Sequence, residues 1–157
     1  MAWIDPTGFD DPGSEWTGET NIYDNSTTSH GDRLSLIGWS NYIVLTHAAF
    51  WCDKIQIYVY RRDANVSVEV SYYDGSWHVI YNGAYTDRQW TEISLGGTYN
   101  ITAIRLRFYN AGASVNIYFY ECDFNEAGAP PVEGIKWNGV TITKWNGQVI
   151  TKLNGLP

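Results

Sequence analysis

The chain is poor in cysteine, with only Cys52 and Cys122 among its 157 residues. Two cysteines are too few for a disulfide framework, and their separation excludes the CxxC spacing of a structural zinc site. Both lie beside aromatic residues of predicted strands. They are therefore expected either as two buried free thiols or as one disulfide bridge.

Basic residues and long apolar runs are also scarce. Ten Lys and Arg stand against 17 Asp and Glu, the net charge is -7, and no basic cluster exceeds Arg61-Arg62. This balance argues against nucleic-acid binding through phosphates. No apolar run approaches the roughly 18 residues of a membrane-spanning helix. The opening MAWIDPTGFDD has neither the basic nor the apolar region of a signal peptide.

The common catalytic motifs are missing. None of the three histidines, His30, His47 and His78, has a recognisable Ser or Cys partner, and GxSxG, HExxH and P-loop patterns do not occur. A carboxylate pair for glycoside hydrolysis remains an alternative. The acids are scattered over turns, however, with none set in an aromatic cleft motif. We therefore predict that the protein is not an enzyme.

Aromatic residues and period-2 alternation are abundant. Aromatics make up 16% of the chain, which is enough for a substantial core. Residues 66–81 alternate apolar and polar side chains around Asp74-Gly75, which predicts a β-hairpin. The same alternation predicts strands over residues 40–46, 54–61, 89–94, 101–110 and 115–124, and Gly96-Gly97 is expected to end the strand before it. No stretch shows a helical period, so we predict an all-β antiparallel jelly-roll sandwich.

The alternation also assigns side chains to faces. In the strand 101–110, Arg105, Arg107 and Tyr109 are expected to point outward. The positions expected to point into the core are Ile55, Ile57, Val68, Val70, Ile104, Leu106, Ile117 and Phe119.

The chain divides into three parts by composition. Residues 1–124 form the predicted sandwich with an N-terminal arm, and 125–134, which contain Pro130-Pro131, read as a semi-rigid linker. Residues 135–157 repeat every eight positions as KWNGVTIT, KWNGQVIT and KLNGLP. Each repeat carries Asn-Gly, the strongest short hairpin signal. Because short strands with free edges pair readily with other chains, we expect an assembly segment whose contacts come from Trp137, Val140, Ile142, Trp145, Val149, Ile150 and Leu153.

The order of several short motifs resembles the galactose-binding-like jelly rolls, which include discoidin and coagulation-factor C domains and family-32 carbohydrate-binding modules. These motifs are NIYDNSTT at 21–28, VSYYDGSW at 70–77, IRLRF at 104–108 and YECDF at 120–124. The resemblance covers roughly residues 14–124. The opening DPTGFDDP also resembles modules of phage structural proteins.

This resemblance implies a structural calcium ion between an N-terminal loop and the last strand. Carried over by position, its ligands are Asp24, Ser26, Thr28 and Glu121. The oxygen-rich loop 24–29 suits calcium. Glu121 shares parity with Ile117 and Phe119, so it is expected on the core side, where a carboxylate needs a partner. The alternative is an Asx-turn at Asp24 and a Glu121 that accepts hydrogen bonds from backbone amides.

In the resembling modules, the ligand lies on loops at one end of the sandwich. Sugars stack on aromatic faces and are held by a few polar groups. The loop residues that could do this are Trp39, Trp51, Arg61, Arg62, Tyr85 and Arg88.

Two functions follow from these features. The first is a non-catalytic virion module, either a capsid decoration or a tail-associated protein, which oligomerises with other virion subunits through its C-terminal repeat. The alternative is a secreted or cell-surface carbohydrate-binding module. The expected location is accordingly a virion surface or the extracellular space, without membrane or nucleic-acid partners.

Overall fold

The computed structural model describes residues 2–35, 37–60, 67–112 and 115–129, together with four short strands between 135 and 149. Within these residues the protein is almost entirely β-structure. The only helical element described is a 3-10 turn, η1 (Glu19–Ile22). No helix among them is long and apolar enough to cross a membrane. The strands of the sandwich are β1 (Ala2–Ile4), β2 (Gly8–Asp10), β3 (Gly31–Ser35), β4 (Gly38–Trp39), β5 (Ile43–Tyr60), β6 (Ser67–Tyr73), β7 (Trp77–Ala84), β8 (Trp90–Asn110) and β9 (Val115–Glu126).

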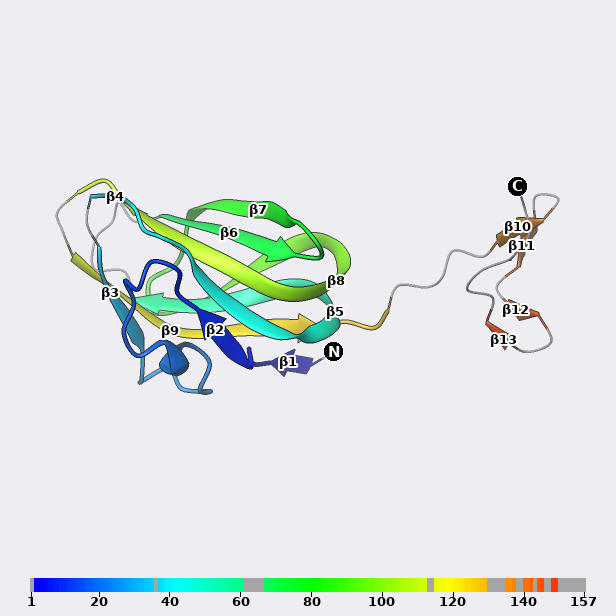
Figure 1. Ribbon diagram of the computed structural model, residues 1–157, viewed down its shortest axis with the longest axis horizontal. Helices are drawn as coiled ribbons and strands as arrows, with labels where there is room; N and C mark the ends of the chain where they lie inside the picture. The colour runs from blue at the N-terminus through cyan, green and yellow to red at the C-terminus, as the bar shows by residue number, and fades with distance from the viewer. Residues whose placement is uncertain are drawn as a thin grey trace.

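Two long strands, β5 and β8, pass through both layers of the sandwich (Figure 1). Residues 43–46 of β5 pair with residues 103–106 of β8, and β6 and β7 continue this first layer. Further along, residues 54–58 of β5 pair with 90–94 of β8 and also with β9, which makes the second layer. Register shifts between Thr46 and Phe50 and between Cys52 and Lys54 mark the change of layer. The predicted antiparallel sandwich is confirmed.

The continuity of these two strands differs from the prediction. The predicted strands 40–46 and 54–61 are parts of the single strand β5, and β8 continues through Gly96-Gly97. Gly96 has φ 81°, a left-handed conformation that glycine adopts without steric cost. The strand therefore bends at this point and pairs again from Tyr99 onward.

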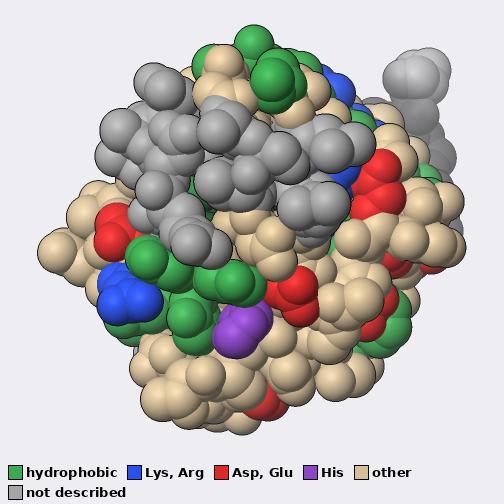
Figure 2. Space-filling model, turned by 90° about the vertical axis from the view of Figure 1, so that its left-hand side faces the viewer, with side chains coloured by type: hydrophobic (Ala, Val, Ile, Leu, Met, Phe, Trp, Pro, Cys, Tyr) green, Lys and Arg blue, Asp and Glu red, His purple; other side chains and the backbone are tan. Residues whose placement is uncertain are grey.

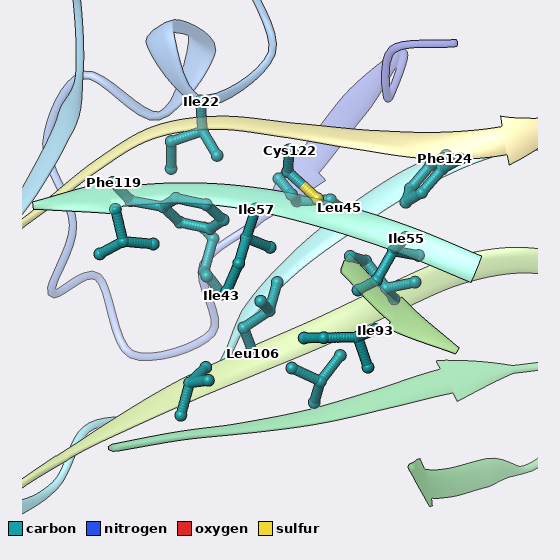
Figure 3. Packing of buried hydrophobic residues seen from close by; sticks show 14 of the residues in the cluster. Ile22, Ile43, Leu45, Ile55, Ile57, Ile93, Leu106, Phe119, Cys122 and Phe124 are labelled. Atoms are coloured by element: carbon teal, nitrogen blue, oxygen red, sulfur yellow. The ribbon is translucent and has the colours of Figure 1, made fainter. Parts of the chain in front are cut away.

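The core lies between the two layers, and every core position predicted from the alternation is confirmed. All of these side chains are at most 1% exposed. Figure 3 shows Ile43, Ile57 and Phe119 packed together with other buried side chains. The N-terminal arm contributes Ile22 from η1 and Trp16, whose ring contacts those of Phe108 and Phe119.

The cysteines are both buried and both free, so the structure selects free thiols. Burial raises the pKa of the Cys52 thiol to about 12 and that of Cys122 well above its usual value. Because the thiolate is the reactive form, neither side chain is suited to nucleophilic or redox chemistry.

The C-terminal repeat forms two separate hairpins. Strand β10 (Ile135–Trp137) pairs with β11 (Val140–Ile142), and β12 (Lys144–Trp145) pairs with β13 (Gln148–Val149). In each hairpin two residues, Asn-Gly, separate the paired strands, as expected from the repeat. Ile150 and Leu153, two of the predicted assembly residues, lie outside the described residues.

Candidate functional site

Aromatic and arginine side chains gather on the outer side of the first layer. Ile104, Leu106 and Phe108 of β8 enter the core, so the alternate residues point outward as predicted. We call this surface the arginine face; it consists of Trp39, Tyr42, Glu69, Ser71, Trp77, Arg105, Arg107 and Tyr109. The register places Arg107 opposite Glu69 and Arg105 opposite Ser71 on β6.

Arg107 and Glu69 form the central ion pair of the arginine face. Nε of Arg107 donates to Oε1 of Glu69 at 3.0 Å, and Nη2 donates to Oε2 at 2.9 Å. The hydroxyl of Tyr42 donates to the same carboxylate at 2.6 Å. Burial raises the pKa of Glu69, but the hydrogen bonds from Arg107 and Tyr42 outweigh it and hold the pKa below its ordinary value. Both carboxylate oxygens are thus engaged by the protein itself.

Arg105 is held differently, by aromatic rings alone. Its guanidinium carbon lies 4.1 Å from the centre of the Tyr42 ring and 4.4 Å from that of Trp77. No residue that the structure describes forms a hydrogen bond or ion pair with this guanidinium, and its Nε is buried without an acceptor. The hydroxyl of Ser71, across the strand pair, is also buried without a partner.

Trp39 provides the exposed aromatic surface at one end of this face. Its side chain is 38% exposed, packs on Tyr109 with 5.2 Å between ring centroids, and lies under the guanidinium of Arg107. The face therefore combines an open aromatic ring with polar groups whose positions are already set, which is the composition of a sugar-binding surface.

A second aromatic surface covers the outer side of the second layer. This tyrosine face consists of His30, Tyr58, Tyr60, Arg88, Trp90, Tyr118 and Tyr120. Tyr60 and Tyr118 are nearly parallel with centroids 5.8 Å apart, and Trp90 is 40% exposed. Figure 2 shows a histidine among hydrophobic side chains at one end of the molecule, with a Lys or Arg at the margin of the patch.

The predicted ligand residues do not converge on one site. Trp39 lies on the arginine face, whereas Arg88 stacks over Tyr60 of the tyrosine face at 4.0 Å. Trp51 pairs with Asn100 of β8, nine positions from the partner of Trp39, which is about 30 Å along a strand.

The remaining predicted ligand residues are Tyr85, Arg61 and Arg62. Tyr85 is only 4% exposed and packs edge-on against Phe108, so its assignment as a surface contact is wrong. Its aromatic ring contributes to the core instead. Arg61 and Arg62 lie outside the described residues.

Sequence reasoning missed several members of the arginine face. Alternation predicted that Arg105 and Arg107 point outward, but it carried no information about their neighbours. Tyr42 and Trp77 come from other parts of the chain and reach the two arginines only through the strand pairings.

A cluster of acids lies under the N-terminal arm, where oxygens of Asp5, Glu121 and Asp123 are all within 4.8 Å of one another. Glu121 accepts backbone hydrogen bonds from Ser26 at 2.9 Å and from Cys122 at 3.2 Å. Burial nevertheless raises the pKa of Glu121 to about 8. Burial also raises the pKa of Asp123; the hydrogen bond from Gln56 lowers it in part, and the nearby Asp5 carboxyl adds to the rise.

Glu121 reaches this cluster because of a β-bulge. Tyr58 pairs with Glu121 whereas Val59 pairs with Phe119, so Tyr120 is an extra residue in β9. An extra residue reverses the alternation that follows it. The prediction that Glu121 shares the core side of Ile117 and Phe119 is therefore wrong: Glu121 lies on the side of Tyr58 and Asp123, beneath the arm.

The predicted calcium loop contacts this cluster through its backbone, since the amide of Ser26 donates to Glu121. The Asn25 side-chain amide also donates to the Asp5 carboxylate, whereas the other polar side chains of the loop bond within it. The Asp24 carboxylate accepts from the Ser29 hydroxyl at 2.6 Å, and the hydroxyls of Ser26 and Thr28 are 2.9 Å apart. The structure thus adds Asp5 and Asp123, which the resemblance did not indicate, to the acids near Glu121.

These acids fit a calcium ion. Calcium binds carboxylate oxygens at 2.3–2.6 Å, so ligand oxygens on opposite sides of one ion are about 5 Å apart, close to the spacing found here. Oδ1 of Asp123 is buried and has no hydrogen-bond partner. A cation would supply that partner and would offset the mutual repulsion of the three acids.

A solvent-open depression at the edge of the second layer offers a different kind of surface. Lys54 and Glu92 form an exposed ion pair in it, at 2.9 Å. Its lining has no aromatic ring and so no stacking surface; it consists of Asp53, Lys54, Glu92, Ser94, Gly97 and Thr98.

Comparison with known proteins supports the fold. No protein-family model matches the chain, and no curated protein matches it. Solved structures do match, and they show that the fold is that of a galactose-binding-like jelly-roll domain, the architecture of family-32 carbohydrate-binding modules.

Three of these structures illustrate the likeness. The family-32 module of AlyQ, in complex with 4,5-unsaturated mannuronic acid, is 16% identical with a TM-score of 0.64 over 81% of this chain and 100% of its own. Chitosan-binding module 1 of a chitosanase/glucanase from Paenibacillus sp. IK-5 is 13% identical with a TM-score of 0.61, over 78% of this chain and 96% of its own. A pectin-binding module is 13% identical with a TM-score of 0.59, over 82% and 96%.

Proposed function

We propose that this protein is a non-catalytic carbohydrate-binding module and that a glycan binds on the arginine face. The observation that carries this proposal is the partly exposed ring of Trp39, which lies under the guanidinium of Arg107, beside an ion pair, Arg107–Glu69, that is already fixed by hydrogen bonds. The solved structures with the same fold support it, since they include a chitosan-binding module, a pectin-binding module and a module in complex with 4,5-unsaturated mannuronic acid.

The geometry suits sugar binding for two physical reasons. The apolar C–H face of a pyranose can stack on the ring of Trp39, while its hydroxyls bond to polar groups at the rim. Glu69 and Tyr42 hold Arg107 in place before any ligand arrives. Such preorganisation lowers the entropy cost of binding.

The test compares two tryptophans of matched exposure on opposite layers. For a polysaccharide that binds the wild type, Trp39→Ala is expected to weaken the affinity at least tenfold, about 1.4 kcal/mol, because stacking surface is lost. Trp90→Ala, from the tyrosine face, is the control and should leave affinity unchanged. Affinity gel electrophoresis against a polysaccharide panel, followed by calorimetry, gives both values. A larger loss in Trp90→Ala would place the glycan on the tyrosine face, and absence of binding to every polysaccharide would refute the function.

We also propose a structural calcium ion bound by Glu121 together with neighbouring carboxylates. The support is the close approach of Asp5, Glu121 and Asp123 and the buried, unpartnered oxygen of Asp123. When bound, calcium would join the N-terminal arm to the last strand of the sandwich. It would act in stability rather than in contact with the glycan, because the arginine face lies on the other layer.

A third proposal concerns assembly. We infer that the C-terminal hairpins pair with other subunits, as each of their short sheets has only two strands among the described residues and a short strand at a sheet edge pairs readily with another chain. Deleting residues 135–157 should leave the melting temperature of the sandwich unchanged but convert an oligomer to a monomer. Light scattering coupled to gel filtration measures this. A deletion variant that unfolds, or one that still oligomerises, would contradict the assembly role. In a virion setting, the full chain should also co-purify with particles.

A further inference from the structure

We propose that Arg105 is a binding site for a carboxylate, so that the glycan recognised by the arginine face contains hexuronate residues. This inference rests on the proposed carbohydrate-binding function and specifies its ligand class. It follows from the contrast between two arginines that are two positions apart on the same strand, Arg105 and Arg107.

The guanidinium of Arg105 is positioned but not neutralised. Tyr42 and Trp77 hold it at 4.1 Å and 4.4 Å from their ring centroids. Within the described part of the chain it has no hydrogen-bond acceptor, and the Arg105 residue is only partly buried, so a ligand can approach it from solvent. A polar group left unpaired in this way costs free energy. The arrangement therefore favours an acceptor that arrives with a ligand.

Arg107, on the same face, differs from Arg105 because its guanidinium is hydrogen-bonded to a carboxylate. Arg107 donates two hydrogen bonds to the Glu69 carboxylate, and the Tyr42 hydroxyl donates a third to it. Glu69 is thus hydrogen-bonded to Arg107, whereas Arg105 feels the Glu69 charge only at longer range and has no hydrogen-bonded counterion among the described residues. A guanidinium presents parallel N–H donors that match the two oxygens of a carboxylate. A neutral sugar would leave this charge without a counterion.

Long-range charge does not produce this preference. The protein carries a net charge of -7, so an acidic polymer is repelled at a distance and any selectivity must come from local contact. The partner of Trp39 on β8 is Tyr109, four positions from Arg105, which is about 13 Å along a strand. One sugar ring is shorter than this, so a ligand that reaches both Trp39 and Arg105 is an oligosaccharide.

The experiment uses uronate trimers with and without charge. Trimers of galacturonate and of mannuronate, each as the free acid and as the methyl ester, are titrated into the full chain by calorimetry at constant calcium and salt. The wild type should bind one of the free acids at least tenfold more tightly than its ester. This comparison needs no variant, so it stays decisive whether or not a substitution at Arg105 folds.

Variants then assign the preference to Arg105. Arg105→Gln should bind acid and ester equally, with the affinity that the wild type has for the ester. Arg88→Gln is the matched control, because Arg88 also stacks on a tyrosine, Tyr60 at 4.0 Å, but on the opposite layer. Arg88→Gln should keep the full preference.

The outcomes separate this inference from the proposed function. The carboxylate site is overturned if the wild type binds acid and ester equally, or if Arg105→Gln retains the preference. In that case neutral glycans are still bound and still lost in Trp39→Ala. If neither form of either trimer binds while a polysaccharide of the panel does, the carboxylate site is likewise overturned; only if no glycan of any kind binds has the proposed function itself failed. Sodium acetate at the same concentration, as a carboxylate without a sugar, should compete weakly with the acid trimer.

Discussion

Calcium added to chelator-treated protein is expected to raise the melting temperature by about 5–10 °C at pH 8. An ion present at a hundred times its Kd stabilises a protein by about 2.7 kcal/mol. For a chain of this length, each kcal/mol corresponds to about 2–4 °C. The gain should be much smaller at pH 5, where Glu121 is protonated. Calorimetry in chelator and in calcium across this pH range provides the measurement.

The pH dependence follows from the raised pKa of Glu121. Its ordinary pKa is 4.5 and its folded pKa is about 8, because burial outweighs the backbone hydrogen bonds and the nearby acids Asp123 and Asp24 add repulsion. Between these values the folded state binds more protons than the unfolded state, so stability in chelator should fall as pH rises from about 5 to 8. Each unit of pKa shift corresponds to about 1.4 kcal/mol. Calcium should reverse the trend.

Glu121→Gln tests the assignment. The amide oxygen can still accept from Ser26 while the charge is gone, so the calcium response and most of the pH dependence should disappear, and only the part due to Asp123 should remain. Asp74→Asn, in the β6–β7 turn, is the control and should keep both. An undiminished calcium response in Glu121→Gln would show that no ion binds there. Asp24→Asn and Asp123→Asn then show whether the ion lies between Glu121 and the loop 24–29 or between Glu121 and the Asp5–Asp123 pair.

The second large effect is expected at Glu69. Glu69→Ala should lower stability by about 2–3 kcal/mol, because removing one partner leaves an arginine without its counterion. This loss is smaller than the roughly 3–5 kcal/mol expected for breaking a fully buried ion pair, because the Arg107 side chain is 30% exposed. Glycan affinity should fall as well, because Arg107 and Tyr42 lose the carboxylate that positions them. Chemical denaturation and calorimetry measure the two effects.

Glu92→Ala is the matched control for this change. Glu92 also pairs with a basic residue, Lys54, but both side chains are largely exposed. Exposed pairs contribute little to stability, because water and salt screen the two charges. The folded pKa of Glu69 lies below its ordinary value, so its stabilisation is present above the ordinary pKa and is lost as pH falls through the folded one. The difference between wild type and Glu69→Ala should therefore shrink as pH falls below the ordinary pKa of 4.5. Equal losses in the two variants at neutral pH would contradict the role given to Glu69.

The alternation of apolar and polar residues was sufficient to predict the fold class and much of the core. Ile55, Ile57, Ile104 and Leu106 are buried where the period-2 pattern placed them, since a strand between two layers leaves one face for the core. The same pattern placed Arg105 and Arg107 on the outside. The motif order also led to the jelly-roll family, because turn residues and strand spacing are local properties of the chain.

The sites, in contrast, were decided by tertiary structure. Glu121 changes sides because one extra residue, Tyr120, enters β9, and a bulge has no signature in the alternation that precedes it. Asp5 joins Glu121 and Asp123 only because the N-terminal arm folds over the last strand. Likewise, Arg105 is held by Tyr42 and Trp77, which belong to distant parts of the chain. Local sequence specifies which way a side chain points from its own strand, whereas the register between distant strands determines what it meets there.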